Sequence, residues 1–250
     1  MNLLFDVGNT ELKLGVADDS KVIKVFRFSK FHDKSIDELY LSFYLIFDDY
    51  DFNKVAISSV VPEMTSKLRA LALEYLNIEA VVVEPGVKTG LKMKADYPAE
   101  VGADLICGSV AASKLGKQVL FIDLGTATKY VYVENNTLSG VVIAPGVEIS
   151  MNALVSNTAL LPTFELKAPK TVLGNNTVTC LQSGIIYGTA AQIEGLVGKI
   201  KKEVNKDFLV VITGGLSVLF NNLLDIPFVD SKNLVLDGLL EILLRNSLVK

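Results

Sequence analysis

Two short segments, about half the chain apart, carry residue types that could bind and transfer phosphate groups. Each reads as a buried strand ending in an aspartate, then a glycine turn with small polar residues, then a second strand. Asp6 and Gly8 mark the first segment, and Asp123 and Gly125 mark the second. Glycine lets the backbone approach a ligand closely, and a carboxylate at a strand end can hold a hydrated divalent cation against phosphate oxygens. Two such turns predict a site that grips a nucleoside triphosphate from both sides. Taken alone, the first turn is equally consistent with an ordinary Gly-Asn hairpin, and the repeat at Asp123 favours binding.

Composition and charge exclude several classes of partner. The 250 residues are 50% hydrophobic, which is enough for one large or two modest domains with ample cores. The 24 lysines and arginines against 28 acidic residues give a net charge of -4, unlike the basic composition of a nucleic-acid binder. No apolar run approaches the roughly 18 residues that cross a bilayer. We therefore expect neither nucleic acid nor a membrane among the partners.

Histidine and cysteine usage narrows the chemistry further. His32 is the only histidine and lies in a polar stretch, where we expect a solvated loop residue. With a single histidine, the sequence lacks the residues for a Ser-His-Asp or Cys-His mechanism and lacks ligands for a zinc site. It also contains no Walker-type phosphate loop. Cys107 and Cys180 have no metal or redox spacing, and no signal peptide is expected. These features indicate reduced thiols in a cytoplasmic protein whose carboxylates and backbone amides do most of the chemistry.

The elements that must position these residues follow one pattern twice. In each half, three strands are followed by alternating helices and strands. In the first half we expect strands within 2–28 and at 54–60 and 79–83, and helices at 36–47, 63–76 and 99–115. In the second half we expect strands at 118–122, 129–133, 139–143 and 208–212, and helices at 147–159, 177–204 and 234–248, with a short helix after 213–215. We place the domain boundary near Gly116, which gives domains at 1–116 and 117–250 without a low-complexity linker.

Seven segments, in order along nearly the whole chain, resemble motifs of the type III pantothenate kinases. The segments are 6–13, 102–104, 123–127, 145–154, 158–162, 174–188 and 213–215. The resemblance implies an α/β protein with two ribonuclease H-like domains of the actin and sugar-kinase superfamily. Their mixed five-stranded sheets would be flanked by helices, with the nucleotide in the interdomain cleft. It also implies a homodimer that uses ATP to phosphorylate pantothenate, the first step to coenzyme A, with Mg²⁺ or another divalent cation and with K⁺ or NH₄⁺.

The resemblance also implies roles for individual residues. ATP and its phosphates would be bound by Asp6, Val7, Gly8, Asn9, Thr10, Lys13, Gly125, Thr126, Gly214 and Gly215. Pantothenate would be bound by Gly102, Ala103, Asp104, Leu105 and Thr177, the last from the neighbouring subunit. Asp6 would position the divalent cation through water, and Asp123 would bind the monovalent cation.

Asp104 and Thr177 each have a plainer interpretation. Asp104 lies in the first turn of an expected helix, where the helix dipole favours a carboxylate that could accept the proton of a primary hydroxyl. First-turn aspartates more often only stabilise their helix, and the adjacent Gly102-Ala103 favours the role of general base. Thr177 begins a helix and could be its N-cap instead of a substrate contact. Gly214 and Gly215 could form an ordinary strand-to-helix turn rather than a surface against the nucleoside.

Several positions depart from the sequence usual in the family. Leu105 replaces the common arginine, whose guanidinium would bind a carboxylate through two hydrogen bonds. Ala95 stands where the family often has a tyrosine, and Tyr97 lies two positions further along the chain. Lys129 and Val131 replace a small polar residue and an aspartate after the second glycine turn. The Lys129 ammonium could partly replace the monovalent cation near Asp123. These departures leave two alternatives open: a nucleotide-binding accessory or regulatory protein without turnover, and a kinase for another small hydroxy acid.

Overall fold

The computed structural model describes residues 1–158 and 160–247 as a mixed α/β protein. The chain divides into two compact units. The first comprises Met1–Lys117, Val133–Gly140 and Asn233–Lys250, and the second Gln118–Tyr132 and Val141–Lys232. The α/β fold class is confirmed, and the boundary near Gly116 stays a prediction.

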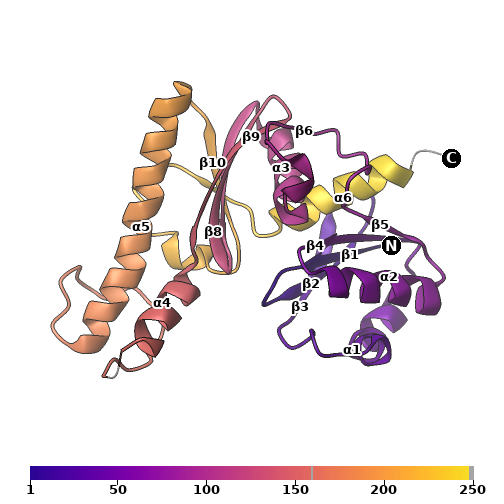
Figure 1. Cartoon of the computed structure of the whole chain (residues 1–250), viewed down its shortest axis with the longest axis horizontal. Coiled ribbons are helices and arrows are strands. Elements are labelled where there is room, and N and C mark those ends of the chain that lie inside the picture. The colour runs from indigo at the N-terminus through magenta and orange to yellow at the C-terminus, as the bar shows by residue number, and fades with distance from the viewer. Residues whose placement is uncertain (159, 248–250) are drawn as a thin grey trace. The chain divides into compact units, whose positions relative to one another are not determined.

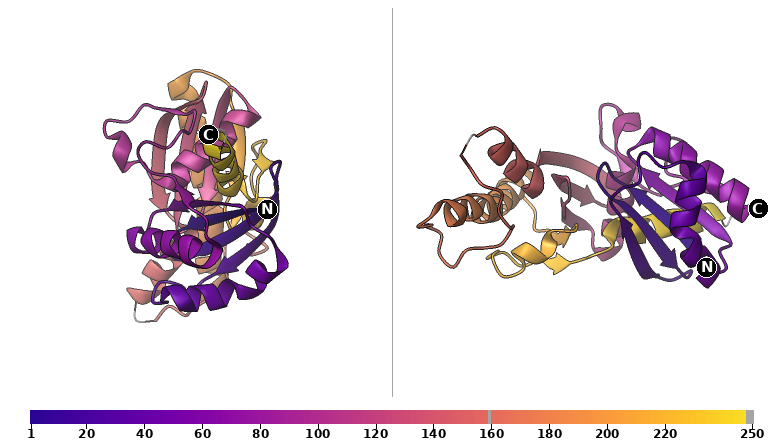
Figure 2. Two further views of the ribbon diagram at one scale, coloured as in Figure 1. Left: turned by 90° about the vertical axis from the view of Figure 1, so that its right-hand side faces the viewer. Right: turned by 90° about the horizontal axis from the view of Figure 1, so that it is seen from below.

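A five-stranded mixed sheet forms the centre of the first unit, in the order β3-β2-β1-β4-β5. Its strands are β1 (Asn2–Val7), β2 (Leu12–Ala17), β3 (Val22–Phe28), β4 (Lys54–Ser59) and β5 (Ala80–Val82). The first three form an antiparallel meander, and β1, β4 and β5 run parallel. The right-hand view of Figure 2 shows the indigo N-terminal strands lying side by side.

Helices cover both faces of this sheet because β1 is apolar on both faces. Leu3 and Phe5 pack with α1 (Ile36–Asp49) and α2 (Pro62–Leu76), whereas Leu4 packs with α3 (Ala103–Leu115) and α6 (Leu234–Ser247). Figure 1 shows these two helix pairs on opposite sides of the strands. A Cβ on Gly238 of α6 would lie 1.8 Å from the carbonyl oxygen of Cys107 on α3, so only glycine allows these helices to approach so closely.

The second sheet has the order β11-β10-β7-β8-β9-β6. Its strands are β6 (Lys92–Met93), β7 (Gln118–Leu124), β8 (Ala127–Glu134), β9 (Thr137–Pro145), β10 (Leu209–Thr213) and β11 (Val229–Asp230). It has six strands rather than the expected five because β6 pairs with the start of β9, where the Lys92 amide donates to the Asn136 carbonyl at 2.8 Å. The long helix α5 (Thr177–Val204) packs on one face through Ile186, Ala190 and Ile193 (Figure 1).

The two sheets repeat one connectivity. The order β3-β2-β1-β4-β5 reappears as β9-β8-β7-β10-β11, and in both cases the first strand runs parallel to the fourth. Asp6 lies opposite Ser58 in the first sheet, and Asp123 lies opposite Thr213 in the second. The two aspartates therefore occupy equivalent register positions, as expected for a duplicated ribonuclease H-like unit.

Five helices begin or end differently from the prediction. The helix α1 runs to Asp49 rather than residue 47, and α2 begins at Pro62 rather than residue 63. The helix expected at 99–115 is divided into η1 (Pro98–Glu100) and α3, because Val101 and Gly102 have extended backbone between them. The helix expected at 147–159 is α4 (Val147–Ser156), and α6 ends at Ser247. The remaining 3-10 turn, η2 (Ser217–Phe220), follows β10. Ala159, the predicted end of the helix 147–159 and part of the matched segment 158–162, lies outside the described residues. Leu248, the predicted end of the helix 234–248, also lies outside them.

Candidate active site

The first glycine turn brings Asp6 and Lys13 together. Asp6 is on β1 directly opposite Lys13 on β2, and the Lys13 Nζ lies 3.2 Å from Asp6 Oδ2. The Gly8 amide donates to the Glu11 carbonyl at 2.9 Å, which closes the turn and leaves Asn9 and Thr10 exposed at its tip. The Asp6 side chain is only 9% exposed, so its carboxylate and the ammonium form a partly buried pair. The turn therefore presents backbone amides, a hydroxyl and a lysine beside one carboxylate.

His32 lies in a turn, in keeping with the expected loop position, and it also supports the first glycine turn. Its Nε2 lies 2.7 Å from the Asn9 carbonyl oxygen, and since a carbonyl can only accept, Nε2 carries the hydrogen. The His32 ring is half-buried and packs against Phe31 at 4.1 Å between ring centroids. The polar sequence around His32 gave no signal of this contact, which joins residues 23 positions apart.

Asp104 is the second residue of α3, and Gly102 caps this helix without a side-chain hydrogen bond. Its Oδ1 accepts the Leu105 amide at 2.9 Å, so the plainer role of stabilising the helix is present. Burial chiefly raises the pKa of the Cys107 thiol on the same helix, and the charges of Asp6 and Asp104 raise it further. Both carboxylates therefore lie near Cys107, on the side of the first sheet that α3 covers. The structure thus brings Asp6, Lys13 and Asp104 into one region of the first unit.

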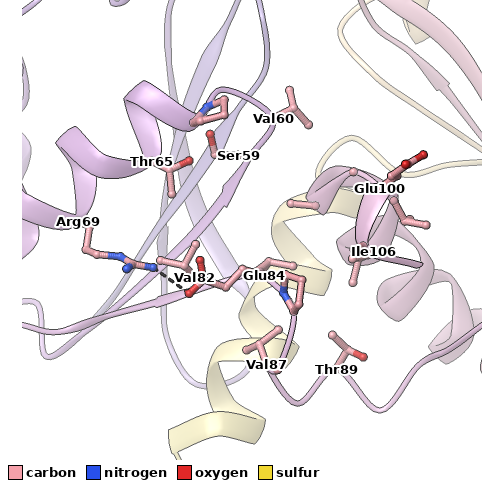
Figure 3. Close-up of a pocket in the computed structure, with 18 of the residues that line it drawn as sticks. Ser59, Val60, Thr65, Arg69, Val82, Glu84, Val87, Thr89, Glu100 and Ile106 are labelled. Atoms are coloured by element: carbon pink, nitrogen blue, oxygen red, sulfur yellow. Dashed lines mark hydrogen bonds and ion pairs between the residues drawn. The ribbon is translucent and has the colours of Figure 1, made fainter. Parts of the chain in front are cut away.

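A pocket of about 1420 Å³ opens beside the start of α3 (Figure 3). Its walls come from α2, the ends of β4 and β5 and the segment leading into α3. Of the predicted substrate-binding residues, Gly102 and Ala103 line it, whereas Asp104, Leu105 and Thr177 are not in its lining. Arg69 brings a guanidinium to the pocket, and Figure 3 shows it directed toward Glu84, with 3.0 Å between Nη2 and Oε1. Residue spacing alone gave no signal for Arg69.

The second glycine turn repeats the carboxylate–lysine pair. Lys129 Nζ lies 3.4 Å from Asp123 Oδ2, and the side chains are 20% and 15% exposed. A Cβ on Gly125 would lie 3.7 Å from Asp123 Oδ1, so this carboxylate lies beside the glycine of the turn. Asp123, Gly125 and Lys129 therefore form one cluster in the second unit.

Two further glycines crowd the second turn. A Cβ on Gly146 would lie 2.2 Å from the Thr126 carbonyl oxygen, and a Cβ on Gly214 would lie 2.5 Å from that of Leu124. Gly214 also has a φ of 100°, a conformation that favours glycine. Gly146 thus lies against Gly125 and Thr126, and Gly214 lies against Leu124 at the start of the same turn. Gly146 was part of a matched segment without an expected role, because its contact with Thr126 is visible only in the fold.

Thr177 is not the cap of α5. Asn176 is the N-cap, and its Oδ1 accepts the Thr179 amide at 3.0 Å in a capping box. Thr177 is the first residue of the helix and is exposed. The interpretation of Thr177 as a helix cap is therefore wrong, and its hydroxyl remains a candidate substrate contact.

The described residues set limits on metal and membrane binding. In residues 1–158 and 160–247 no three or more His, Cys, Asp or Glu side chains are grouped to hold a metal ion. No helix in the same part of the chain is long and apolar enough to span a bilayer. A nucleotide site shared by both glycine turns stays a prediction.

Comparisons with known proteins show relatives along the whole chain. The family model described as type III pantothenate kinase matches residues 2–199. A type III pantothenate kinase from Acholeplasma laidlawii is 46% identical over 246 residues, covering 98% of this chain and 99% of its own. Another from Halalkalibacterium halodurans is 38% identical and covers 98% and 100%. A Baf family protein of known structure from Campylobacter jejuni has a TM-score of 0.62 at 17% identity, covering 99% and 100% of the two chains, which shows a common fold.

Proposed function

The chain belongs to the type III pantothenate kinase family, and on that premise we propose that it transfers the γ-phosphoryl group of ATP to the primary hydroxyl of pantothenate. The products are 4'-phosphopantothenate and ADP, which places the reaction at the entry to coenzyme A synthesis. The observation that carries the proposal is the position of Asp104 next to Gly102 and Ala103, which line a pocket large enough for such a substrate. We place the reaction in the cytoplasm, in keeping with the two unpaired cysteines.

The pocket matches the chemistry of pantothenate. Val60, Val82 and Val87 give it apolar walls suited to a gem-dimethyl group. The Arg69 guanidinium, which is paired with Glu84 at 3.0 Å, would exchange that partner for the pantothenate carboxylate. Such a guanidinium would compensate for Leu105, which cannot bind a carboxylate. With the hydroxyl end directed toward the start of α3, Asp104 accepts the hydroxyl proton as the oxygen attacks the γ-phosphorus in line. The bond to the bridging oxygen breaks, and ADP leaves.

The glycine turns supply the contacts to the nucleotide. In the first, the backbone around Gly8 and the side chains of Thr10 and Lys13 contact phosphate oxygens. In the second turn, Gly125 and Thr126 contact phosphate oxygens, and Gly214 and Gly215 lie against the nucleoside. These roles follow from the family and from the exposed turn at Asn9–Thr10. Because backbone amides hold their positions before ATP binds, they stabilise charge that develops in the transition state without rearranging.

The residues fit a divalent cation at Asp6. One largely buried carboxylate beside a phosphate-binding turn is the oxygen-donor set that suits Mg²⁺, which keeps several of its waters and takes its other ligands from phosphates. When bound, the cation would neutralise phosphate charge, while Lys13 holds the Asp6 carboxylate in place. The divalent cation at Asp6 would be held through its own water shell, which leaves room for Lys13 beside the carboxylate. The residues do not fit a monovalent cation bound directly to Asp123, because the Lys129 ammonium already lies 3.4 Å from that carboxylate.

The second subunit of a homodimer would complete the substrate site. Thr177 is exposed at the start of α5, and the family implies that the matching threonine touches pantothenate bound to the neighbouring subunit. Exposed apolar side chains near α4 and α5 support an interface there, among them Ile143, Leu160 and Leu173.

Replacement of Asp104 by asparagine tests the proposed role most directly. Asp104→Asn keeps the size of the side chain and removes the proton acceptor, so turnover with pantothenate should fall about 10²- to 10⁴-fold. ATP binding, measured by calorimetry, should remain within about threefold of the wild type. The control is Asp49→Asn at the exposed end of α1, which should leave both quantities unchanged. An Asp104→Asn enzyme with undiminished pantothenate-dependent ADP release would refute the assignment of the base.

A further inference from the structure

The pair Asp123–Lys129 lies at the point where the family resemblance implies a monovalent cation. Lys129 on β8 holds its Nζ 3.4 Å from Asp123 Oδ2 at the end of β7. Both side chains are largely buried, so this is a fixed charge pair rather than a flexible surface contact. The second glycine turn therefore carries its own positive charge, attached covalently to the chain.

Strand alternation places the Asp123–Lys129 pair on one face of the second sheet. Ile122, Tyr130 and Tyr132 belong to the core beneath α5, so Asp123, Lys129 and Val131 face the opposite side of the second sheet. Val131 is fully buried and apolar at the place where the family commonly has an aspartate. Asp123 and Lys129 thus lie together on this face, at the turn. A bound K⁺ would bring a second positive charge next to the ammonium, which is unfavourable.

The first unit contains the same arrangement. Lys13 on β2 lies 3.2 Å from Asp6 on β1, in the equivalent hairpin of the duplicated fold. Both hairpins therefore pair the strand-end aspartate with a lysine from the following strand. An ammonium and K⁺ are both compact single positive charges, so one can take the electrostatic place of the other.

We propose that the Lys129 ammonium takes the place of a monovalent cation at Asp123, so that this chain needs neither K⁺ nor NH₄⁺. The inference rests on the proposed kinase function and specifies the ionic requirement of the same site. It also explains why the two departures at Lys129 and Val131 occur together. Lysine supplies one positive charge, and valine removes the carboxylate that a mobile cation would otherwise help to neutralise.

The test compares the wild type with Lys129→Met and with the control Lys54→Met. Lys54 is also a strand lysine paired with an aspartate, at 3.2 Å from Asp19, outside the site. Proteins are prepared in buffers whose only monovalent cations are Tris and choline. Melting temperatures are measured with the non-hydrolysable analogue Mg-AMPPNP, and initial rates are measured with Mg-ATP and pantothenate. KCl is then compared with choline chloride, each at about 100 mM so that screening is equal.

The wild type and Lys54→Met should show no melting shift specific to K⁺ and less than about a twofold change in initial rate. Lys129→Met should melt at a higher temperature with K⁺ than with choline, and K⁺ should raise its rate about tenfold or more. Tenfold or greater activation of the wild type by K⁺ would overturn the proposal. A folded Lys129→Met protein whose melting temperature and initial rate are both unaffected by K⁺ would also overturn it. If Lys129→Met does not fold, Lys129→Thr is judged by the same criteria. The melting measurement requires no turnover, so failure of the kinase function would be seen separately.

Discussion

The carboxylate of Asp104 is held in position by a glycine two residues before it. A Cβ on Gly102 would lie 2.6 Å from Asp104 Oδ1, which is too close for the carboxylate to stay where it is. The Gly102 backbone has φ of −57° and ψ of 142°, which alanine adopts easily. Substitution by alanine should therefore move the carboxylate rather than distort the backbone.

We predict that Gly102→Ala lowers the turnover number about 10- to 100-fold, because a carboxylate displaced by about 1 Å no longer meets the hydroxyl correctly. The free energy of unfolding should fall by about 1 kcal/mol or less, the usual cost of alanine at an N-cap. Steady-state kinetics and urea unfolding provide the two measurements. Gly195→Ala on α5, where an added Cβ meets no atom within 4 Å, is the control. Unchanged turnover in Gly102→Ala would show that the position of this carboxylate does not matter.

At the scale of elements, α6 is a helix of the C-terminal segment that packs within the first unit. Its residues Leu236, Leu239 and Leu243 are buried in the core that α6 shares with α3. Asp237 lies between them near the start of the helix, and burial raises the pKa of its carboxyl above the ordinary value of 3.8. The charged form of Asp237 is therefore less favourable in the folded protein than in the unfolded chain.

We predict that Asp237→Asn stabilises the protein at neutral pH. Below pH 3.8 the Asp237 carboxyl is protonated in both states and does not lower the free energy of unfolding. The destabilisation by its buried charge grows as the pH rises toward the raised pKa of the folded state, and it reaches its full size above that pKa. The melting temperature of the variant should therefore exceed that of the wild type at about pH 7, and the difference should shrink toward about pH 4. Glu241→Gln, one turn later, is the control: Glu241 is paired with Lys114 at 3.1 Å, so its loss should not stabilise. A difference between Asp237→Asn and the wild type that is independent of pH would contradict this account.

At the scale of the whole molecule, the repeated succession of strands and helices along the chain was predictable because its signals are local. Strand–turn–strand patterns around Asp6 and Asp123 lie within about 15 residues, and α5 was expected with the bounds that it has. The short strand β6 was not expected, since two residues give no periodicity and pair only through the distant start of β9. The contacts of His32 with Asn9 and of Gly146 with Thr126 likewise join segments far apart in sequence. Local pattern can indicate which residues bind, and the fold decides what positions them.

If Thr177 completes the site of the neighbouring subunit, two inactive variants should restore each other. In a mixed dimer of Asp104→Asn and Thr177→Ala, one site receives both native residues and the other receives neither. Equal amounts of the two proteins, unfolded together and refolded, should regain about a quarter of the wild-type activity, since half of the dimers are mixed and each has one intact site. Activity that stays at the level of the separately refolded variants would place Thr177 in its own subunit's site or outside any site.

The most direct test of the central claim is the conversion of pantothenate itself by the purified wild-type chain with Mg-ATP. We predict that ADP appears only when pantothenate is present and that mass spectrometry finds 4'-phosphopantothenate in equal amount. Tight ATP binding without product from pantothenate would contradict the account, and product from another small hydroxy acid instead would show that the pocket beside Asp104 has a different substrate.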